Sequence, residues 1–313
     1  MHYFARSLLI AAFVFAVACS ANTAAHAQQK FKTPEEAVAA LVAAARSDNV
    51  RDMVRVLGDG GRDIVISGDD VADRTARAAF LIAYDLKHQI VKQGERRADL
   101  VIGKNDWQLP IPLVQTGDTW QFDSAAGRRE VLSRRIGRNE LNAIQTSLAY
   151  VDAQNDYASM NPEGGKADTY AQRILSSPGK KDGLYWPAAA NEPQSPLGAG
   201  FAAATIQGYR PGVGDTPAPY HGYYYKVLTA QGPNAPGGAM NYVVNDNMIG
   251  GFALVAYPAE YGNSGVMTFL VNHTGTVLQK DLGEHTARIA SRMTTFNPDQ
   301  TWRKVPEADL RTQ

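Results

Sequence analysis

A long helical pattern near the middle of the chain places the strongest constraint on what this sequence can fold into. From about Ala126 to Met160, apolar residues recur at the spacing of one helix face. The residues on that face are Leu132, Ile136, Ile144, Leu148 and Val151. A helix must bury such a face against other elements, so we expect this one to pack on a sheet formed by the strands that follow it.

Helices also begin the segment that precedes the long helix. Thr33-Pro34-Glu35-Glu36 is a capping box with proline at the first helical position, and it predicts a helix over 34–47. Further helices are predicted at 49–57 and at about 70–87. The residues expected to be buried on the last of these are Val71, Ala78, Ala79, Ile82 and Leu86.

Strand-like runs separate these helices from the long one. They lie at 98–103, 107–117 and 118–124, with turn residues between them. Pro110 and Pro112 cannot donate to a strand ladder, so the middle run should lie at a sheet edge or contain a bulge. Helices followed by an antiparallel sheet predict an α+β unit that is similar to cystatin-like or nuclear-transport-factor-like folds.

The segment after the long helix changes character twice. Residues 161–239 are rich in Pro, Gly and aromatic residues and are expected to form long ordered loops over a sheet. Strands of an antiparallel meander are predicted at 223–228, 240–244, 249–257, 266–272 and 276–279, before a closing helix at about 284–292. The predicted fold class is therefore α+β, with one domain at 28–125 and a second, built on the long helix, at 126–313.

The N-terminus has the pattern of a secretory signal peptide. Arg6 precedes a short apolar run, and Ala25-His26-Ala27 is a cleavage site of the A-x-A type. We expect cleavage between Ala27 and Gln28, which makes 1–27 the signal peptide and the mature protein periplasmic or secreted. The alternative is a lipoprotein in which Cys19, the only cysteine of the chain, is lipidated.

Composition and motif searches exclude several classes of function. Lys plus Arg and Asp plus Glu number 31 each, so the neutral chain has no general attraction to nucleic acid, and no nucleic-acid partner is expected. The histidines that follow the signal peptide form no H-x-x-x-H or H-x-H pair. There is no G-x-S-x-G elbow, dinucleotide fingerprint or Walker loop. We predict no catalytic residue, no metal and no cofactor.

Carboxylates leave one enzymatic alternative open. A hydrolase that modifies the cell wall could use Asp215, Asp246 or Glu260, and it would need two carboxyl groups about 5–9.5 Å apart. Asn245-Asp246-Asn247 and the group Asp69, Asp70 and Asp73 could offer oxygen atoms to calcium, but neither fits a calcium-loop consensus. Turn and helix-cap roles explain them better.

Aromatic residues form the best candidate binding surface. Tyrosine and tryptophan are favoured at binding sites because they combine a large rigid area with a polar tip. The candidates lie in or beside the loop-rich segment: Tyr185, Trp186, Tyr209, Tyr220, His221 and Tyr224. The alternative is that these residues belong to the core, since side chains in the run Tyr223 to Tyr225 alternate between the two faces of a strand.

An arginine cluster in the first half of the long helix has two interpretations. Its members are Arg128, Arg129, Arg134, Arg135 and Arg138. They could form a site for an anion or an acidic partner. Alternatively, they are a solvated face, or a hinge where arginines pair with carboxylates of the other domain.

Three strings resemble one exported bacterial family, catalogued as domain of unknown function twenty-nine fifty. They are RRIGRNELNAIQTSLAYVDAQNDYA, YHGYYYKVLTAQGPNAPGGAMNY and GGFALVAYPAEYGNSGVMTFLVNHTGTVLQKDLGEHT. The resemblance covers nearly all of the mature chain and implies no activity or catalytic residue. The order of helix, variable loop and strands is also similar to the soluble domain of type IV pilins and pseudopilins. An Arg-rich segment stands where pilins have a membrane helix, which argues against filament assembly.

The sequence thus favours an exported, non-enzymatic binding or scaffold protein of the cell envelope. The expected partner is another envelope protein or a cell-wall polymer. The alternatives are the carboxylate-dependent hydrolase and an accessory component of a pilin-like secretion assembly.

Overall fold

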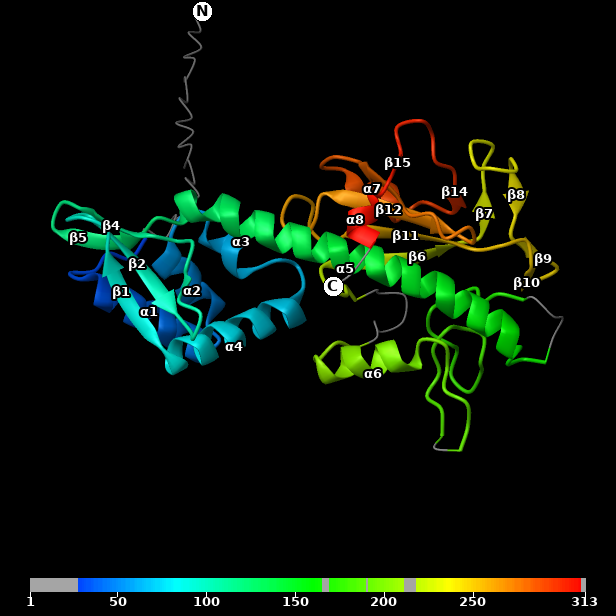
Figure 1. Ribbon diagram of the computed structural model, residues 1–313, viewed down its shortest axis with the longest axis horizontal. Helices are drawn as coiled ribbons and strands as arrows, with labels where there is room; N and C mark the ends of the chain where they lie inside the picture. The colour runs from blue at the N-terminus through cyan, green and yellow to red at the C-terminus, as the bar shows by residue number, and fades with distance from the viewer. Residues whose placement is uncertain (1–27, 165–168, 190, 211–217, 311–313) are drawn as a thin grey trace, which may run out of the picture.

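The long helix joins two packed units into an elongated molecule (Figure 1). The structure is a computed structural model that describes residues 28–164, 169–189, 191–210 and 218–310. Helix α5, Ser124–Met160, begins in the N-terminal unit and continues under the sheet of the C-terminal unit. Each of the two units has its own hydrophobic core. Helices combined with antiparallel sheets confirm the predicted α+β class. The domain boundary at 125/126 stays a prediction.

The N-terminal unit contains four helices and a five-stranded sheet. The helices are α1 (Pro34–Arg46), α2 (Val50–Leu57), α3 (Gly61–Val65) and α4 (Asp70–Leu86). The strands are β1 (His88–Lys92), β2 (Arg97–Ile102), β3 (Trp107–Gln108), β4 (Leu113–Thr116) and β5 (Thr119–Phe122). They are ordered β1-β2-β4-β5, with β3 paired to β2. The helices predicted at 34–47, 49–57 and 70–87 are present, whereas α3 and β1 were not predicted.

Helix α4 turns a different face to the core from the one predicted. Ile82 and Leu86 are 70% and 55% exposed, and Ala78 and Ala79 are also exposed. The residues that pack against the core are Phe80, Leu81, Ala83 and Tyr84. The prediction of that stripe was wrong because the helix has two apolar faces, and apolar spacing alone cannot say which of them is buried. The N-terminal cap of the helix decides which face turns toward the core. Buried Asp69 caps the helix and buried Asp73 follows one turn later, so the face in line with Asp73 points inward.

The prolines of the middle strand-like run, 107–117, interrupt it, but not at a sheet edge. The segment 109–112 separates β3 from β4, and both strands pair with β2. β4 also pairs with β5, so it lies inside the sheet. The Leu109 N–H still donates to the Leu100 carbonyl at 2.8 Å, which keeps the chain beside β2 across the break.

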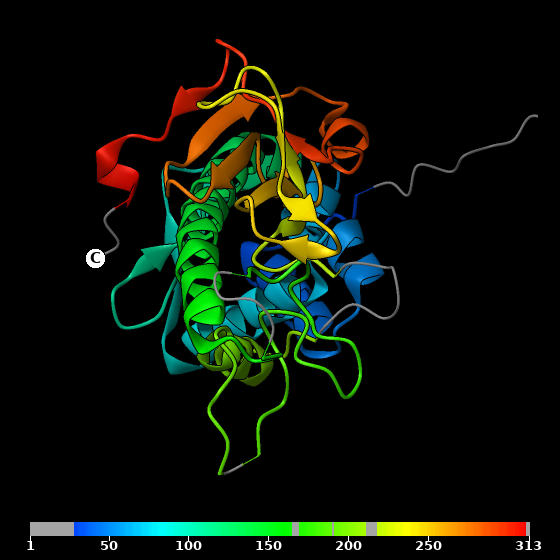
Figure 2. The same cartoon turned by 90° about the vertical axis from the view of Figure 1, so that its right-hand side faces the viewer.

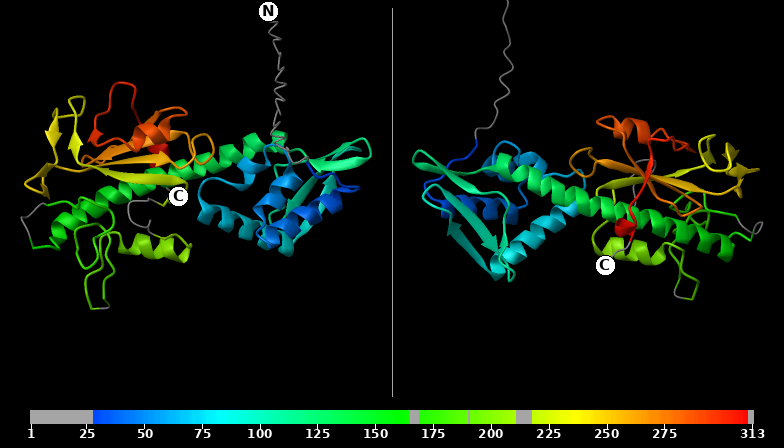
Figure 3. Two further views of the ribbon diagram at one scale, coloured as in Figure 1. Left: turned by 180° about the vertical axis from the view of Figure 1, so that it is seen from behind. Right: turned by 45° about the horizontal axis from the view of Figure 1, so that its top comes forward.

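The C-terminal unit is built on a second five-stranded sheet. Its strands, in order across the sheet, are β15 (Arg303–Lys304), β13 (Leu278–Asp281), β12 (Met267–Asn272), β11 (Ala253–Pro258) and β6 (Tyr223–Leu228). Helix α5 covers one face, and α7 (Thr286–Ala290) lies over the other (Figures 1 and 3). β11, β12 and β13 form the expected antiparallel meander.

The strand predicted at 240–244 does not enter this sheet. Because β6 pairs directly with β11, the segment between them forms two small sheets at the end of the molecule. One contains β14 (Thr295–Phe296), β7 (Ala230–Gln231) and β8 (Met240–Asn241), and the other contains β9 (Val243–Val244) and β10 (Asn247–Met248). The loop-rich segment contains α6 (Gly198–Ile206), and α8 (Glu307–Leu310) ends the described chain.

The predicted apolar face of α5 is the face that packs. Leu132, Ile144 and Val151 are buried, and Leu148 packs half-buried against the C-terminal core. Ile136, the fifth member of the predicted face, is half-buried and belongs to neither core. Each buried large apolar side chain stabilises the fold by about 1.5–3 kcal/mol. No helix in the described ranges is long and apolar enough to cross a membrane.

Candidate functional site

An apolar pocket lies between α5, the outer edge of β6 and helix α6. Its volume is about 730 Å³, within the range of small-molecule sites. Figure 2 shows α6 on the α5 side of the molecule, below the sheet. Its walls come from several separate stretches of chain. They include Thr146, Ala149 and Tyr150 of α5, Ile174 and Leu175 of the following loop, Phe201 and Ala204 of α6, and Tyr225 and Val227 of β6.

The charged residues that line this pocket are all cations. Arg173, Arg210 and Lys226 contribute to its described lining, which contains no carboxylate. Arg173 is held 3.9 Å from Asp182. The Lys226 ammonium donates to the Ser291 carbonyl at 2.7 Å at the end of α7, so its charge lies on the α7 side of the sheet, and the pocket cations are Arg173 and Arg210. The lining therefore combines an apolar wall with positive charge, which suits a ligand with an apolar body and an anionic group.

Neutral polar side chains of tyrosine, threonine and glutamine also line the pocket, among them Thr146, Gln172 and Tyr225. The Tyr225 hydroxyl is buried and makes no well-formed hydrogen bond with a described residue, but a weaker hydrogen-bonding contact with the Thr146 side chain lowers its pKa against the larger effect of burial. Burial raises the pKa of Tyr225 and of Tyr220, so both hydroxyls are protonated donors. A ligand acceptor would give the Tyr225 hydroxyl a better-formed hydrogen bond than its contact with Thr146 does.

Four of the six predicted aromatic residues lie at the pocket or support its wall. Tyr209 and Tyr220 line it. His221 packs against both rings, with centroids 5.4 and 4.2 Å away. Tyr185 stacks at 4.1 Å on Phe201, a lining residue.

Trp186 and Tyr224 lie elsewhere. Trp186 is buried against Tyr157, with ring centroids 6.3 Å apart. Tyr224 packs against Tyr257 at 5.5 Å, on the sheet face opposite to that of Tyr225. The binding role of the predicted set stays a prediction.

The pocket also contains residues that sequence reasoning missed. Strand alternation did place Tyr223 and Tyr225 on one face, but it could not say that only Tyr225 reaches a cavity. Phe201 belongs to a short helix within a segment that was expected to be loop. The lining cations come from distant parts of the chain, and no sequence motif connects them.

One wall of the pocket is attached to the N-terminal unit through Asp69. This carboxylate is 1% exposed and accepts hydrogen bonds from the Tyr209 hydroxyl at 3.0 Å and the Gly222 N–H at 2.8 Å. Its other oxygen caps α4 by accepting from the N–H groups of Val71 and Ala72. Turn and cap roles thus explain Asp69, as the sequence suggested, and its second oxygen fixes Tyr209.

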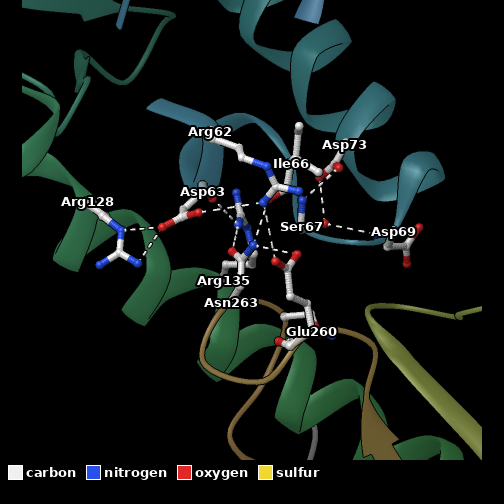
Figure 4. Close-up of polar contacts among 11 residues, drawn as sticks. Arg62, Asp63, Ile66, Ser67, Asp69, Asp73, Arg128, Arg135, Glu260 and Asn263 are labelled. Atoms are coloured by element: carbon white, nitrogen blue, oxygen red, sulfur yellow. Dashed lines mark hydrogen bonds and ion pairs between the residues drawn. The ribbon is translucent and has the colours of Figure 1, made fainter. Parts of the chain in front are cut away.

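Two arginines of α5 hold the junction between the units (Figure 4). Arg135 donates to the backbone carbonyls of Asp63 at 2.7 Å and Ile64 at 2.5 Å, and also to the side-chain oxygen of Asn263 in the C-terminal unit. Arg128 binds the Asp63 carboxylate at 2.7 Å. The Arg128–Asp63 pair is of the arginine–carboxylate kind that the hinge interpretation expects, whereas Arg135 is bound by carbonyl and amide oxygens. Neighbouring Arg134 instead pairs with Glu130 on the exposed side of α5.

The carboxylates of the hydrolase alternative are not brought together. Glu260 lies at the junction, where it accepts from Asn263 at 3.0 Å and pairs with Arg62 at 3.5 Å. Asp246 occupies the turn between β9 and β10 with a left-handed backbone, at the far end of the molecule. Asp215 and Cys19 lie outside the described residues. Among the side chains that the structure describes, no group of three His, Cys, Asp or Glu residues could hold a metal ion.

Comparison with known proteins identifies a family and no individual relative. The family model described as Protein of unknown function (DUF2950) matches residues 28–305. No curated protein and no solved structure matches the chain. The similarity to pilins, cystatins and nuclear-transport-factor-like folds is therefore not confirmed.

Proposed function

The chain belongs to the DUF2950 family, and we propose that it is a non-enzymatic binding protein of the cell envelope. The proposed ligand has an apolar body and an anionic group, and it occupies the pocket between α5, β6 and α6. The observation that carries this proposal is the composition of that pocket. A volume of about 730 Å³ is lined by aromatic and aliphatic side chains, with the guanidinium groups of Arg173 and Arg210 as its cations.

The arrangement of polar groups supports binding over catalysis. The pocket lining offers tyrosine hydroxyls and cations but neither a carboxylate nor a histidine that could act as a general base. At the junction, the carboxylates of Asp63 and Glu260 are paired with arginine, and that of Asp69 accepts hydrogen bonds from backbone N–H groups of α4. A hydrolase of the two-carboxylate type therefore has no support from the described residues.

Export is the second part of the proposal. The family match begins at Gln28, the residue expected to follow signal-peptide cleavage. The Gln28 side chain is held by the carbonyls of Leu57 at 2.9 Å and Phe122 at 2.7 Å, so the folded unit includes this residue. Mass spectrometry of the protein from an exporting host should find a chain that begins at Gln28. An acylated Cys19 would show the lipoprotein alternative to be correct.

A fluorescent dye with the proposed chemistry tests the pocket. Anilinonaphthalene sulfonate joins an apolar ring system to an anion, and we expect saturable binding of one dye per protein, weakened by added salt. Ala204→Trp should abolish it because Ala204 lines the pocket on α6. Ala202→Trp is the matched control, since Ala202 is exposed on the same helix and is not a lining residue. Equal dye binding by the two variants would refute the proposed site.

A further inference from the structure

We propose that the ligand of this pocket is an extended peptide segment that adds a strand to the free edge of β6. The inference rests on the proposed function and names its ligand class. The peptide would pair with the backbone of Tyr225 and Val227, place an apolar side chain in the cavity and bring a carboxylate to the cations of the lining. The argument begins with the direction of the backbone groups of β6.

In an antiparallel pair, the N–H and C=O groups of successive residues point alternately toward the partner strand and away from it. Tyr223 exchanges backbone hydrogen bonds with Tyr220, at 2.8 and 3.1 Å, so its groups point away from β11. Pro258 lies opposite Tyr223 in the register. Proline has no N–H, so it fits this position only because Tyr223 and Pro258 form a pair without hydrogen bonds between them. Tyr225 and Val227 share this orientation because they are two and four residues further along.

Both ends of the β6 edge are occupied by the protein itself. Tyr220 pairs with Tyr223 at one end. Thr229, just beyond the other end, donates to the Thr294 carbonyl at 3.2 Å and accepts from the Tyr242 N–H at 2.9 Å. Between them, no described residue bonds to the outward backbone groups of Tyr225 or Val227. The open part of the edge is therefore short and closed at both ends.

The pocket lies along this open part. Tyr225, Lys226 and Val227 are all lining residues, so the unpaired backbone groups border the cavity. Peptides that add to sheet edges gain affinity from main-chain hydrogen bonds and specificity from pockets that take alternate side chains. Tyr150 and Leu254 are also lining residues, and we expect an apolar side chain of such a peptide to contact them.

Charge supports a peptide that carries a carboxylate. The described lining contains Arg173 and Arg210 and no acidic residue, whereas the ammonium of Lys226 is held by the Ser291 carbonyl on the α7 side of the sheet. Arg210 has no ion pair or hydrogen bond with another described residue. A C-terminal carboxylate or an acidic side chain of the bound strand would pair with one of these arginines.

The test uses a synthetic pool of acetylated heptapeptides in which threonine alternates with a variable apolar residue and the C-terminus is a free carboxylate. Mass spectrometry would identify the members retained by the protein, and the tightest would be studied further. We expect a dissociation constant below about 1 mM, competition with the dye, and weaker binding when the carboxylate is amidated. If no member of the pool binds while the dye does, the peptide inference is wrong and the proposed function stands. If neither binds, both are wrong.

Backbone N-methylation provides the matched control for strand addition. Only alternate amides of an added strand face the sheet edge. Methylating one alternate set of peptide amides should abolish binding, and methylating the other set should change the affinity by less than about threefold. Equal effects from the two sets would show that the peptide binds through side chains and does not add a strand.

Hydrogen exchange and a proline substitution test whether the peptide pairs with the backbone of β6. In hydrogen exchange followed by NMR, peptide should slow exchange at the amides of Tyr225 and Val227, while those of Tyr224 and Lys226 are already protected by β11. Val227→Pro removes one outward N–H without removing a hydrogen bond between β6 and β11. It should lower the affinity for the peptide about tenfold more than Val227→Ala does. Saturating peptide that leaves exchange at Tyr225 and Val227 unchanged would overturn the inference.

Discussion

The hydroxyl of Tyr209, a residue of the pocket wall, donates a 3.0 Å hydrogen bond to the buried carboxylate of Asp69 in the N-terminal unit. The same oxygen accepts the Gly222 N–H from the turn that leads into β6. A single carboxylate therefore fixes the end of the α6 segment and the start of the edge strand. The N-terminal unit thereby fixes one wall of a pocket whose described lining lies in the C-terminal unit.

Asp69→Ala should lower the free energy of unfolding by about 2–4 kcal/mol. The variant loses the cap of α4 and leaves the Gly222 N–H and the Tyr209 hydroxyl without their acceptor. Denaturant unfolding followed by circular dichroism would measure the loss. Asp70→Ala is the control because Asp70 is exposed and adjacent, and its removal should cost less than about 1 kcal/mol. Similar losses in the two variants would show that the contacts of Asp69 contribute little.

Arg135→Ala should destabilise the junction far more than Arg134→Ala. The first change removes donors from two backbone carbonyls and from Asn263, at a cost of about 2–3 kcal/mol. The second removes an exposed pair with Glu130 on the same helix, worth about 0.3–0.5 kcal/mol. Limited proteolysis should cut the Arg135 variant faster between the units. If the two variants melt and are cleaved alike, Arg135 does not hold the units together.

The sequence predicted those features that depend on local pattern and cap chemistry. The face of α5 follows from its apolar spacing, and α1 begins after Thr33, whose hydroxyl accepts from the Glu36 N–H at 3.2 Å. Patterning failed for α4, where two faces are apolar and the buried carboxylates decide the rotation. β1 was missed because its residues are largely exposed and the strand has no apolar alternation.

The pocket could not be predicted because its parts meet only after folding. Thr146, Ile174, Phe201 and Tyr225 come from four elements whose packing no local pattern encodes. Aromatic composition did point to the correct segment, but it could not separate Tyr209 and Tyr220, which line the cavity, from Trp186, which is in the core. The unpaired edge of β6 depends on a topology in which β11 pairs on one side only.

Stability should fall as the pH drops below about 6.5, the ordinary pKa of histidine. Burial lowers the pKa of His221, although Asp69 partly opposes this effect, and burial also lowers the pKa of His273. A histidine whose pKa is lower in the folded state stabilises the fold above the unfolded pKa. That contribution is lost as the pH falls from the unfolded pKa toward the folded one.

The variant His221→Asn isolates this contribution. His221 and Gly222 have φ values of 49° and 76°, and asparagine followed by glycine is favoured in such turns. Unfolding midpoints measured between pH 7.5 and 5 should therefore fall less steeply in the variant than in the native protein. Asp73 acts in the opposite sense, because burial raises its pKa, but it is present in both proteins. Parallel pH curves for the two would contradict a contribution from His221.

Two glycines of α5 should respond in opposite directions to alanine. Gly137 is exposed, and a Cβ there would have no heavy atom within 4 Å among the described residues. Gly137→Ala should therefore stabilise the protein by about 0.5–1 kcal/mol through helix propensity. Gly127 lies against the Pro110 carbonyl and Ile111, and a Cβ there would clash with that backbone.

Gly127→Ala should accordingly destabilise the protein by about 1–3 kcal/mol, because the segment 109–112 would have to move away from β2. Thermal unfolding of the two variants and the native protein measures whether each substitution raises or lowers the melting temperature. The comparison tests the docking of α5 on the N-terminal sheet, since helix propensity alone predicts stabilisation at both positions. A rise in melting temperature for Gly127→Ala would mean that α5 does not pack against the proline segment.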